Sequence, residues 1–237
     1  MPALTPTELR SKLAYEYELI ASLRSPAFGP VRGYASMTDA RAGRELSPAE
    51  AKAGRPAVYD ITYRFAIPVS PECTTDQAVA HFDLLGGGNF PFSLPIVTVR
   101  SRPMPFSPHV HPTSGIVCLG EGWERARGQM LAAQLVVHVM HLLNLDEPRP
   151  RPSWRGFSAE AAEWWRARGC RPFNADLEYP VLDPSLTHGV APSRPAFRVC
   201  ATVSPVTFRP AESRSVAFSG SVDPPPAFQV TNGGWGR

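Results

Sequence analysis

Lysine is almost missing from this chain of 237 residues, in which Lys12 and Lys52 are the only lysines among 24 Lys and Arg residues. Such a strong preference for arginine is typical of a GC-rich bacterial genome. The net charge is only +3, and the arginines are scattered rather than gathered into one band. The chain therefore lacks the electrostatic signature of a nucleic-acid-binding protein.

Long apolar runs and targeting signals are also missing. No segment reaches the ~18 consecutive apolar residues that a membrane-spanning helix needs. The first ten residues, MPALTPTELR, lack the charged-then-apolar pattern of a secretion signal. We therefore expect a soluble, cytoplasmic protein that binds neither membranes nor nucleic acid.

Cysteine pairs with metal or redox spacing do not occur. The four cysteines, Cys73, Cys118, Cys170 and Cys200, are widely separated, and none belongs to a C-x-x-C pair. This excludes the usual zinc and thioredoxin-like motifs. Without a secretion signal, four reduced thiols are the natural expectation. The sequence predicts neither a metal site nor a cofactor.

The N-terminal residues predict a capped helix. Thr5 and Glu8 have the spacing of a capping box, and Pro6 suits the first helical position. Apolar residues then recur on one side, at Leu9, Leu13, Tyr17 and Ile20. The helix should end before Pro26. Residues 27–54 are polar and contain several glycines, so we expect a mobile loop there.

Strand patterns follow from residue 59. The alternation of Tyr59, Ile61, Tyr63, Phe65 and Ile67 with polar residues predicts a strand with one buried face. Weaker strand patterns cover residues 78–85 and 94–99.

Two helices are predicted after the strands. Residues 129–145 are apolar nearly all round, which is typical of a buried helix. Ser158 caps a short helix over 159–168, with Trp164 and Trp165 as apolar anchors.

The C-terminal part has a different composition. Residues 171–237 hold 10 of the 27 prolines and no lysine. Two short strands are predicted, over 197–206 and 214–218, and the final stretch 223–237 is predicted to be disordered. We therefore expect a catalytic domain over residues 1–170 and a Pro-rich extension over 171–237.

Four elements stand in a fixed order between Phe90 and Leu145. They are the segment Phe90-Pro91-Phe92-Ser93-Leu94-Pro95, the segment Gly115-Ile116-Val117-Cys118-Leu119, Trp123, and the long apolar helix. This order resembles the core of the ubiquitin-conjugating enzyme family. There a Tyr-Pro-Phe-x-x-Pro signature precedes a Gly-x-Ile-Cys-Leu segment, a Trp and a buried helix. The resemblance implies an α+β fold of the ubiquitin-conjugating type. Its expected parts are an N-terminal helix, an antiparallel meander of three or four strands, a buried central helix and a short C-terminal helix.

The resemblance also implies a function for Cys118. In that family the cysteine receives a ubiquitin-like modifier from an activating enzyme as a thioester, and passes it to a nucleophile on a target protein. A chain that carries such a thioester benefits from having few lysines, because a nearby lysine would capture the modifier. With its bacterial composition, the chain resembles the conjugating enzymes of bacterial antiviral defence operons, whose neighbouring genes encode a modifier, an activating enzyme and a deconjugating peptidase.

The family's His-Pro-Asn motif has two alignments here. Ser107-Pro108-His109-Val110 puts His109 in the asparagine position, with one extra residue before Cys118. The alternative, His111-Pro112-Thr113, keeps the His-Pro pair but leaves the loop three residues short. We prefer His109, because it needs the smaller length change. Like the family's asparagine, an imidazole N–H can donate a hydrogen bond to an oxyanion.

Other interpretations are open at this stage. Cys118 could be structural, although its predicted loop contains Gly115 and Gly120, which let a partner approach closely. The missing asparagine is compatible with an inactive relative that binds a modifier as a scaffold. A cysteine hydrolase could use His138, His141 or His188 as its base. His138 and His141 could also share a metal, but no third ligand is apparent, and core histidines are the ordinary explanation.

Overall fold

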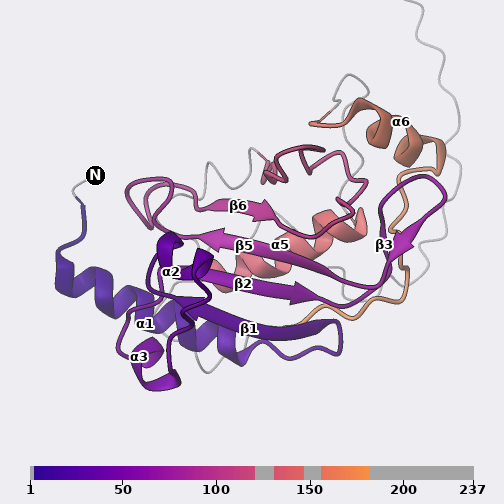
Figure 1. The fold of residues 1–237 in the computed structure, drawn as a ribbon. Coiled ribbons are helices and arrows are strands. Elements are labelled where there is room, and N and C mark those ends of the chain that lie inside the picture. The colour runs from indigo at the N-terminus through magenta and orange to yellow at the C-terminus, as the bar shows by residue number, and fades with distance from the viewer. Residues whose placement is uncertain (1–2, 121–130, 147–155, 182–237) are drawn as a thin grey trace, which may run out of the picture. The chain divides into compact units, whose positions relative to one another are not determined.

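The computed structural model describes residues 3–120, 131–146 and 156–181 (Figure 1). All of them belong to the first of two compact units, residues 1–196. In chain order the elements are α1 (Pro6–Ser22), β1 (Phe28–Tyr34), α2 (Met37–Arg41), α3 (Pro48–Lys52), β2 (Val58–Tyr63), β3 (Ile67–Pro68), β4 (Thr74–Thr75), β5 (Ala78–Asp83), β6 (Ile96–Val99), α5 (Ala132–Asn144) and α6 (Ala159–Ala167).

The main sheet is a four-stranded antiparallel meander. Its strand order is β1-β2-β5-β6, and β3 and β4 form a separate two-stranded hairpin between β2 and β5 in the sequence. The alternation that predicted the first long strand is confirmed, since Tyr59, Ile61 and Tyr63 are all buried. The predicted α+β class with an antiparallel sheet is confirmed as well.

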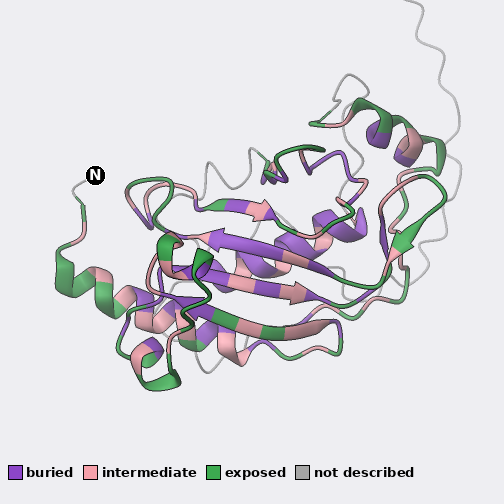
Figure 2. Ribbon diagram, viewed as in Figure 1, coloured by how far each residue is buried: buried purple, intermediate pink, exposed green. Residues whose placement is uncertain are grey.

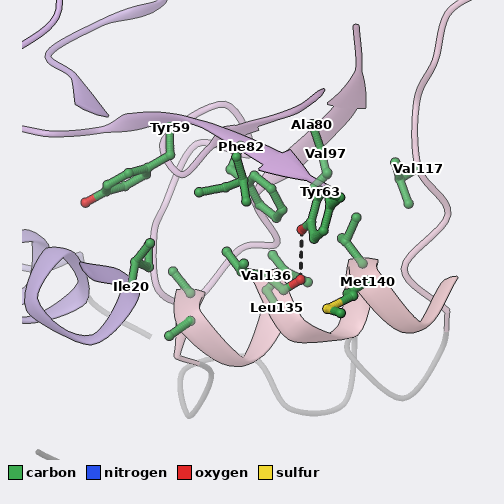
Figure 3. Packing of buried hydrophobic residues seen from close by; sticks show 14 of the residues in the cluster. Ile20, Tyr59, Tyr63, Ala80, Phe82, Val97, Val117, Leu135, Val136 and Met140 are labelled. Atoms are coloured by element: carbon green, nitrogen blue, oxygen red, sulfur yellow. Dashed lines mark hydrogen bonds between the residues drawn. The ribbon is translucent and has the colours of Figure 1, made fainter. Parts of the chain in front are cut away.

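Helix α5 covers one face of this sheet and is almost completely buried (Figures 1 and 2). Its side chains pack against the inward-facing residues of β2, β5 and β6. Figure 3 shows Tyr63 reaching from β2 to α5, where its hydroxyl donates to the carbonyl oxygen of Val136 at 2.8 Å. The prediction of a buried central helix is confirmed for the residues from Ala132 on, while 129 and 130 lie outside the described residues.

Helix α1 packs against α5 and has the predicted capping box. The Thr5 hydroxyl accepts from the Glu8 amide, and the Glu8 carboxylate accepts from the Thr5 amide. The helix ends at Ser22, before Pro26 as expected.

The prediction of a mobile loop over residues 27–54 is wrong. This segment contains β1, α2 and α3. Pro30 and two glycines hid the strand, because these residues are rare in strand interiors. The strand has an irregular register between Phe28 and Val31. A Cβ atom at Gly29 would lie 2.8 Å from Thr62 Cβ, so glycine permits close approach of β1 to β2 there.

Helix α6 is capped by Ser158, whose hydroxyl accepts from the Ala161 amide, as predicted. Trp165 is buried, and Trp164 packs edge-on against Phe106 with ring centroids 5.5 Å apart. Beyond residue 170, Leu177 and Tyr179 still pack against the main core.

Several sequence predictions fall outside the described residues. These are the strands over 197–206 and 214–218, the final stretch 223–237, Trp123, His188 and Cys200. Within the described ranges, none of the helices has both the length and the apolar character that crossing a membrane requires.

Candidate functional site

Cys118 lies outside regular helices and strands, on a short two-stranded ribbon that follows β6. Val110 and Val117 form an antiparallel bridge. On one side of this bridge the Cys118 amide donates to the His109 carbonyl at 2.7 Å. On the other side the His111 amide donates to the Ile116 carbonyl at 2.8 Å. We call this element, residues 109–111 paired with 116–118, the thiol ribbon.

The thiol ribbon continues the main sheet beyond β6. Thr98 forms a bridge with Ile116, and the Val117 amide donates to the Val97 carbonyl at 2.9 Å. The turn of the ribbon is closed by the Gly115 amide, which donates to the His111 carbonyl at 2.9 Å. A Cβ atom at Gly115, whose φ is +73°, would collide with the Val99 carbonyl oxygen, so this turn requires glycine.

His109 and Cys118 are directly opposite each other in this register. The bridge itself ends at Val110, because His109 lies in a turn closed by the Val110 amide, which donates to the Ser107 carbonyl at 3.2 Å. Val110 and Val117 are buried in the core. Cys118 is half-buried, and His109 is 6% exposed. The fold thus brings the backbones of His109 and Cys118 together, through the hydrogen bond from the Cys118 amide to the His109 carbonyl.

His111 is bound within its own turn. Its Nδ1 lies 3.4 Å from the Thr113 amide nitrogen and 3.3 Å from the Ser114 amide nitrogen, so it accepts from both. The ring packs edge-on against Phe157, with centroids 5.5 Å apart. In the ribbon His111 stands opposite Ile116 rather than Cys118.

His138 connects α5 to the residue after Cys118. Its Nε2 lies 3.0 Å from the Leu119 carbonyl oxygen. A carbonyl only accepts, so Nε2 carries the proton and donates it. His138 is buried, as a histidine on a buried helix is expected to be.

His141, one turn further along α5, takes part in a different cluster. Its Nδ1 lies 3.2 Å from Asp146 Oδ2, and its ring stacks on Tyr179 at a centroid distance of 3.7 Å. The hydrogen bond from His141 lowers the pKa of Asp146. Within the described ranges, no group of three or more His, Cys, Asp and Glu side chains is arranged to hold a metal ion.

Two buried polar groups were missed by sequence reasoning. On the sheet, His81 Nδ1 lies 2.6 Å from Asp60 Oδ1, and the His81 side chain is 2% exposed. Burial acts to raise the pKa of Asp60, but the hydrogen bond and charge of His81, together with the charge of Arg100 and the hydrogen bond of Tyr34, outweigh it and lower the pKa. His81 occupies an outward position in the strand alternation, so its burial could not be predicted from the local pattern.

The other missed group is Glu16 on α1, which is fully buried. Its Oε1 is 2.7 Å from Lys12 Nζ, and its Oε2 accepts from the Ala132 amide at 2.7 Å, at the start of α5. Burial raises the pKa of Glu16. The available signal was its position in the apolar stripe of α1, between Leu13 and Ile20.

No protein-family profile, curated protein or solved structure matches this chain.

Proposed function

We propose that this chain is a ubiquitin-conjugating-like acyltransferase with a fold of that type. It carries a ubiquitin-like modifier as a thioester on Cys118, receives it from an activating enzyme and transfers it to a target protein. The pairing of a half-buried Cys118 with His109 on the thiol ribbon is the observation that carries this proposal. A role in bacterial antiviral defence is part of the proposal and rests on the sequence resemblance.

Backbone hydrogen bonds around Cys118 support its role as a nucleophile held in a fixed position. The Cys118 amide is bonded to His109, and the residues on either side are bonded to β6 and α5. A thiol on such a backbone needs little reorganisation when it meets a thioester. Gly120, two residues after Cys118, has a positive φ, and an added Cβ atom there would meet nothing within 4 Å among the described residues, which leaves room for a partner's chain.

The reaction consists of two acyl transfers. The Cys118 thiolate attacks the carbonyl carbon of the modifier thioester, a new C–S bond forms, and the thiolate of the activating enzyme leaves. A target amine then attacks the same carbon, loses its proton and expels the Cys118 thiolate. A thiol of ordinary acidity serves both as nucleophile and as leaving group. The imidazole of His109, whose backbone carbonyl accepts from the Cys118 amide, would donate to the oxyanion of each tetrahedral intermediate.

Apolar surface beside the thiol supports docking of a protein partner. Ile116 is two residues before Cys118, so it shares the face of the thiol, and it is 45% exposed. Phe157, which packs on His111, is 42% exposed.

The hydrolase alternative gains no support from His138 or His141, and its third candidate base, His188, lies outside the described residues. His138 donates from Nε2 to Leu119, and His141 is engaged by Asp146 and Tyr179. The alternative of an inactive scaffold remains the competing proposal, because it needs the same fold and the same partner.

The experiment that separates these proposals uses a bacterial ubiquitin-like modifier with its activating enzyme and ATP. The acyltransferase should form a covalent adduct that a reducing agent cleaves, and Cys118→Ser should form an oxyester that resists the reducing agent. Cys73→Ala, Cys170→Ala and Cys200→Ala should keep the thioester. A scaffold would bind the modifier without forming any adduct, and that result would reject the proposal.

A further inference from the structure

We infer that His138 is a positioning residue for Cys118, and that it acts together with Ser107 by tying both strands of the thiol ribbon to helix α5. The inference deepens the proposed function and rests on it for the role of the thiol. Its structural part concerns the ribbon alone and is tested independently of any partner.

His138 holds the second strand. Its Nε2–H donates to the carbonyl of Leu119, at 3.0 Å, directly after Cys118. Directly before Cys118, the Val117 amide is bonded to Val97 in β6. The backbone is therefore fixed on both sides of the thiol, once by the sheet and once by the buried helix.

Ser107 holds the first strand. Its hydroxyl donates to the Leu142 carbonyl of α5 at 3.2 Å and accepts from the His109 amide at 3.2 Å. Leu142 follows His138 by four residues, so the two attachment points lie about one turn apart along α5. Ser107 is 1% exposed and His138 is 8% exposed, so water competes little with either bond.

The two bonds therefore fix the His109–Cys118 pair relative to the core. Their loss would let the ribbon separate from α5 while the valine pair still anchors it in the core. Because a buried carbonyl is then left without its donor, local opening should increase by roughly tenfold or more.

The test is amide hydrogen exchange of the full chain, resolved by NMR at Cys118, whose amide donates to His109. His138→Leu removes the donor and should speed this exchange roughly tenfold, while His138→Gln, which keeps an N–H at a similar reach, should restore it. His141→Leu is the matched control on the same helix and should leave the Cys118 amide unchanged, because His141 bonds to Asp146.

Ser107→Ala is an independent test, and it should also speed amide exchange at Cys118 roughly tenfold. Its control is Ser22→Ala, which removes a hydroxyl-to-carbonyl bond within α1, where the Ser22 hydroxyl donates to Leu19 at 2.7 Å. If His138→Leu does not fold, the exchange measurement on Ser107→Ala decides whether these bonds hold the thiol ribbon to α5.

The positioning role also predicts slower discharge of the modifier in His138→Leu and recovery in His138→Gln. Unchanged exchange at Cys118 in both His138→Leu and Ser107→Ala would overturn the inference. An equal increase in the rate of amide exchange in α1, in β2 and at Cys118 would also overturn the inference, because His138 and Ser107 would then have only a general packing role. The variants could show the expected faster exchange at Cys118 while the wild type forms no adduct. That result would uphold the attachment of the thiol ribbon to α5 and would reject the proposed function.

Discussion

Cys118 and His109 face each other across the thiol ribbon, with the Cys118 amide nitrogen 2.7 Å from the His109 carbonyl oxygen. This bond uses only backbone atoms, so it does not depend on the side chain of either residue, except that proline at position 118 would remove the donor. The side chains can therefore be changed one at a time without removing the bond that holds the strands together.

His109→Ala should slow discharge of the modifier to an acceptor by about 10²–10³-fold, the usual effect of removing one oxyanion donor. His109→Asn should recover much of this rate. Loading should suffer less, because the activating enzyme contributes to that step. Single-turnover loading and discharge rates, measured beside melting temperatures, provide the test. Equal loss in both steps together with a lower melting temperature would assign His109 a structural role, and unchanged discharge would direct attention to His111.

Ile116→Ser should weaken modifier loading, because it removes an exposed apolar side chain on the face of the thiol. Val181→Ser is the control, since Val181 is 81% exposed and lies in the segment after α6, where the Glu178 carbonyl accepts from Ser25. The concentration of charged activating enzyme that gives half-maximal loading should rise several-fold for Ile116→Ser alone. An equal rise for both variants would mean that apolar surface next to Cys118 has no special role.

Tyr63→Phe should lower the free energy of unfolding by about 0.5–1.5 kcal/mol, the usual net value of a hydrogen bond. The Tyr63 hydroxyl is buried and donates to Val136. Tyr59→Phe is the matched comparison, because the Tyr59 hydroxyl is equally buried but has no hydrogen-bond partner within the described residues. That variant should be neutral or slightly stabilised. Urea unfolding of the two variants tests the difference, and a larger loss for Tyr59→Phe would contradict it.

Glu16 predicts an unusual dependence of stability on pH. Burial raises its pKa in the folded state, so the folded protein binds this proton more tightly than the unfolded chain does. The resulting stabilisation is complete below the unfolded-state value of about 4.5 and is lost as the pH rises through the folded-state pKa. The stability of the wild type relative to Glu16→Gln should therefore increase as the pH falls from 8 towards 4.5.

Urea midpoints of both proteins across this range measure the effect. Using the difference between the two proteins removes the contributions of Asp60 and Asp146, whose pKa values are lowered. If the wild type instead gained stability relative to Glu16→Gln as the pH rose, the ion pair with Lys12 would lower the pKa of Glu16 by more than burial raises it.

The sequence predicted elements whose signals are local. The capping box at Thr5 and Glu8, the alternation from Tyr59 and the apolar helix α5 each depend on neighbouring residues, and all were found. Strand β1 was missed because Pro30 and its glycines weaken the local signal, while pairing with β2 stabilises the strand.

For the site, the sequence indicated Cys118 and His109 but not their register. The bonds that hold them come from Ser107 to Leu142 and from His138 to Leu119, which are separated by 35 and 19 positions. Such contacts leave no periodic pattern in the sequence. Glu16 and His81 are polar residues at buried positions, and each has a partner distant in the chain, Ala132 for Glu16 and Asp60 for His81.

Intact-mass spectrometry of the chain after incubation with the modifier, its activating enzyme and ATP tests the central claim most directly. The account predicts a species heavier by the mass of one modifier minus water, lost on treatment with a thiol reductant, present in the Cys73→Ala variant and missing from Cys118→Ala. An adduct of the same mass that persists in Cys118→Ala, or the failure of the wild type to form one with an activating enzyme that is itself charged, would contradict it.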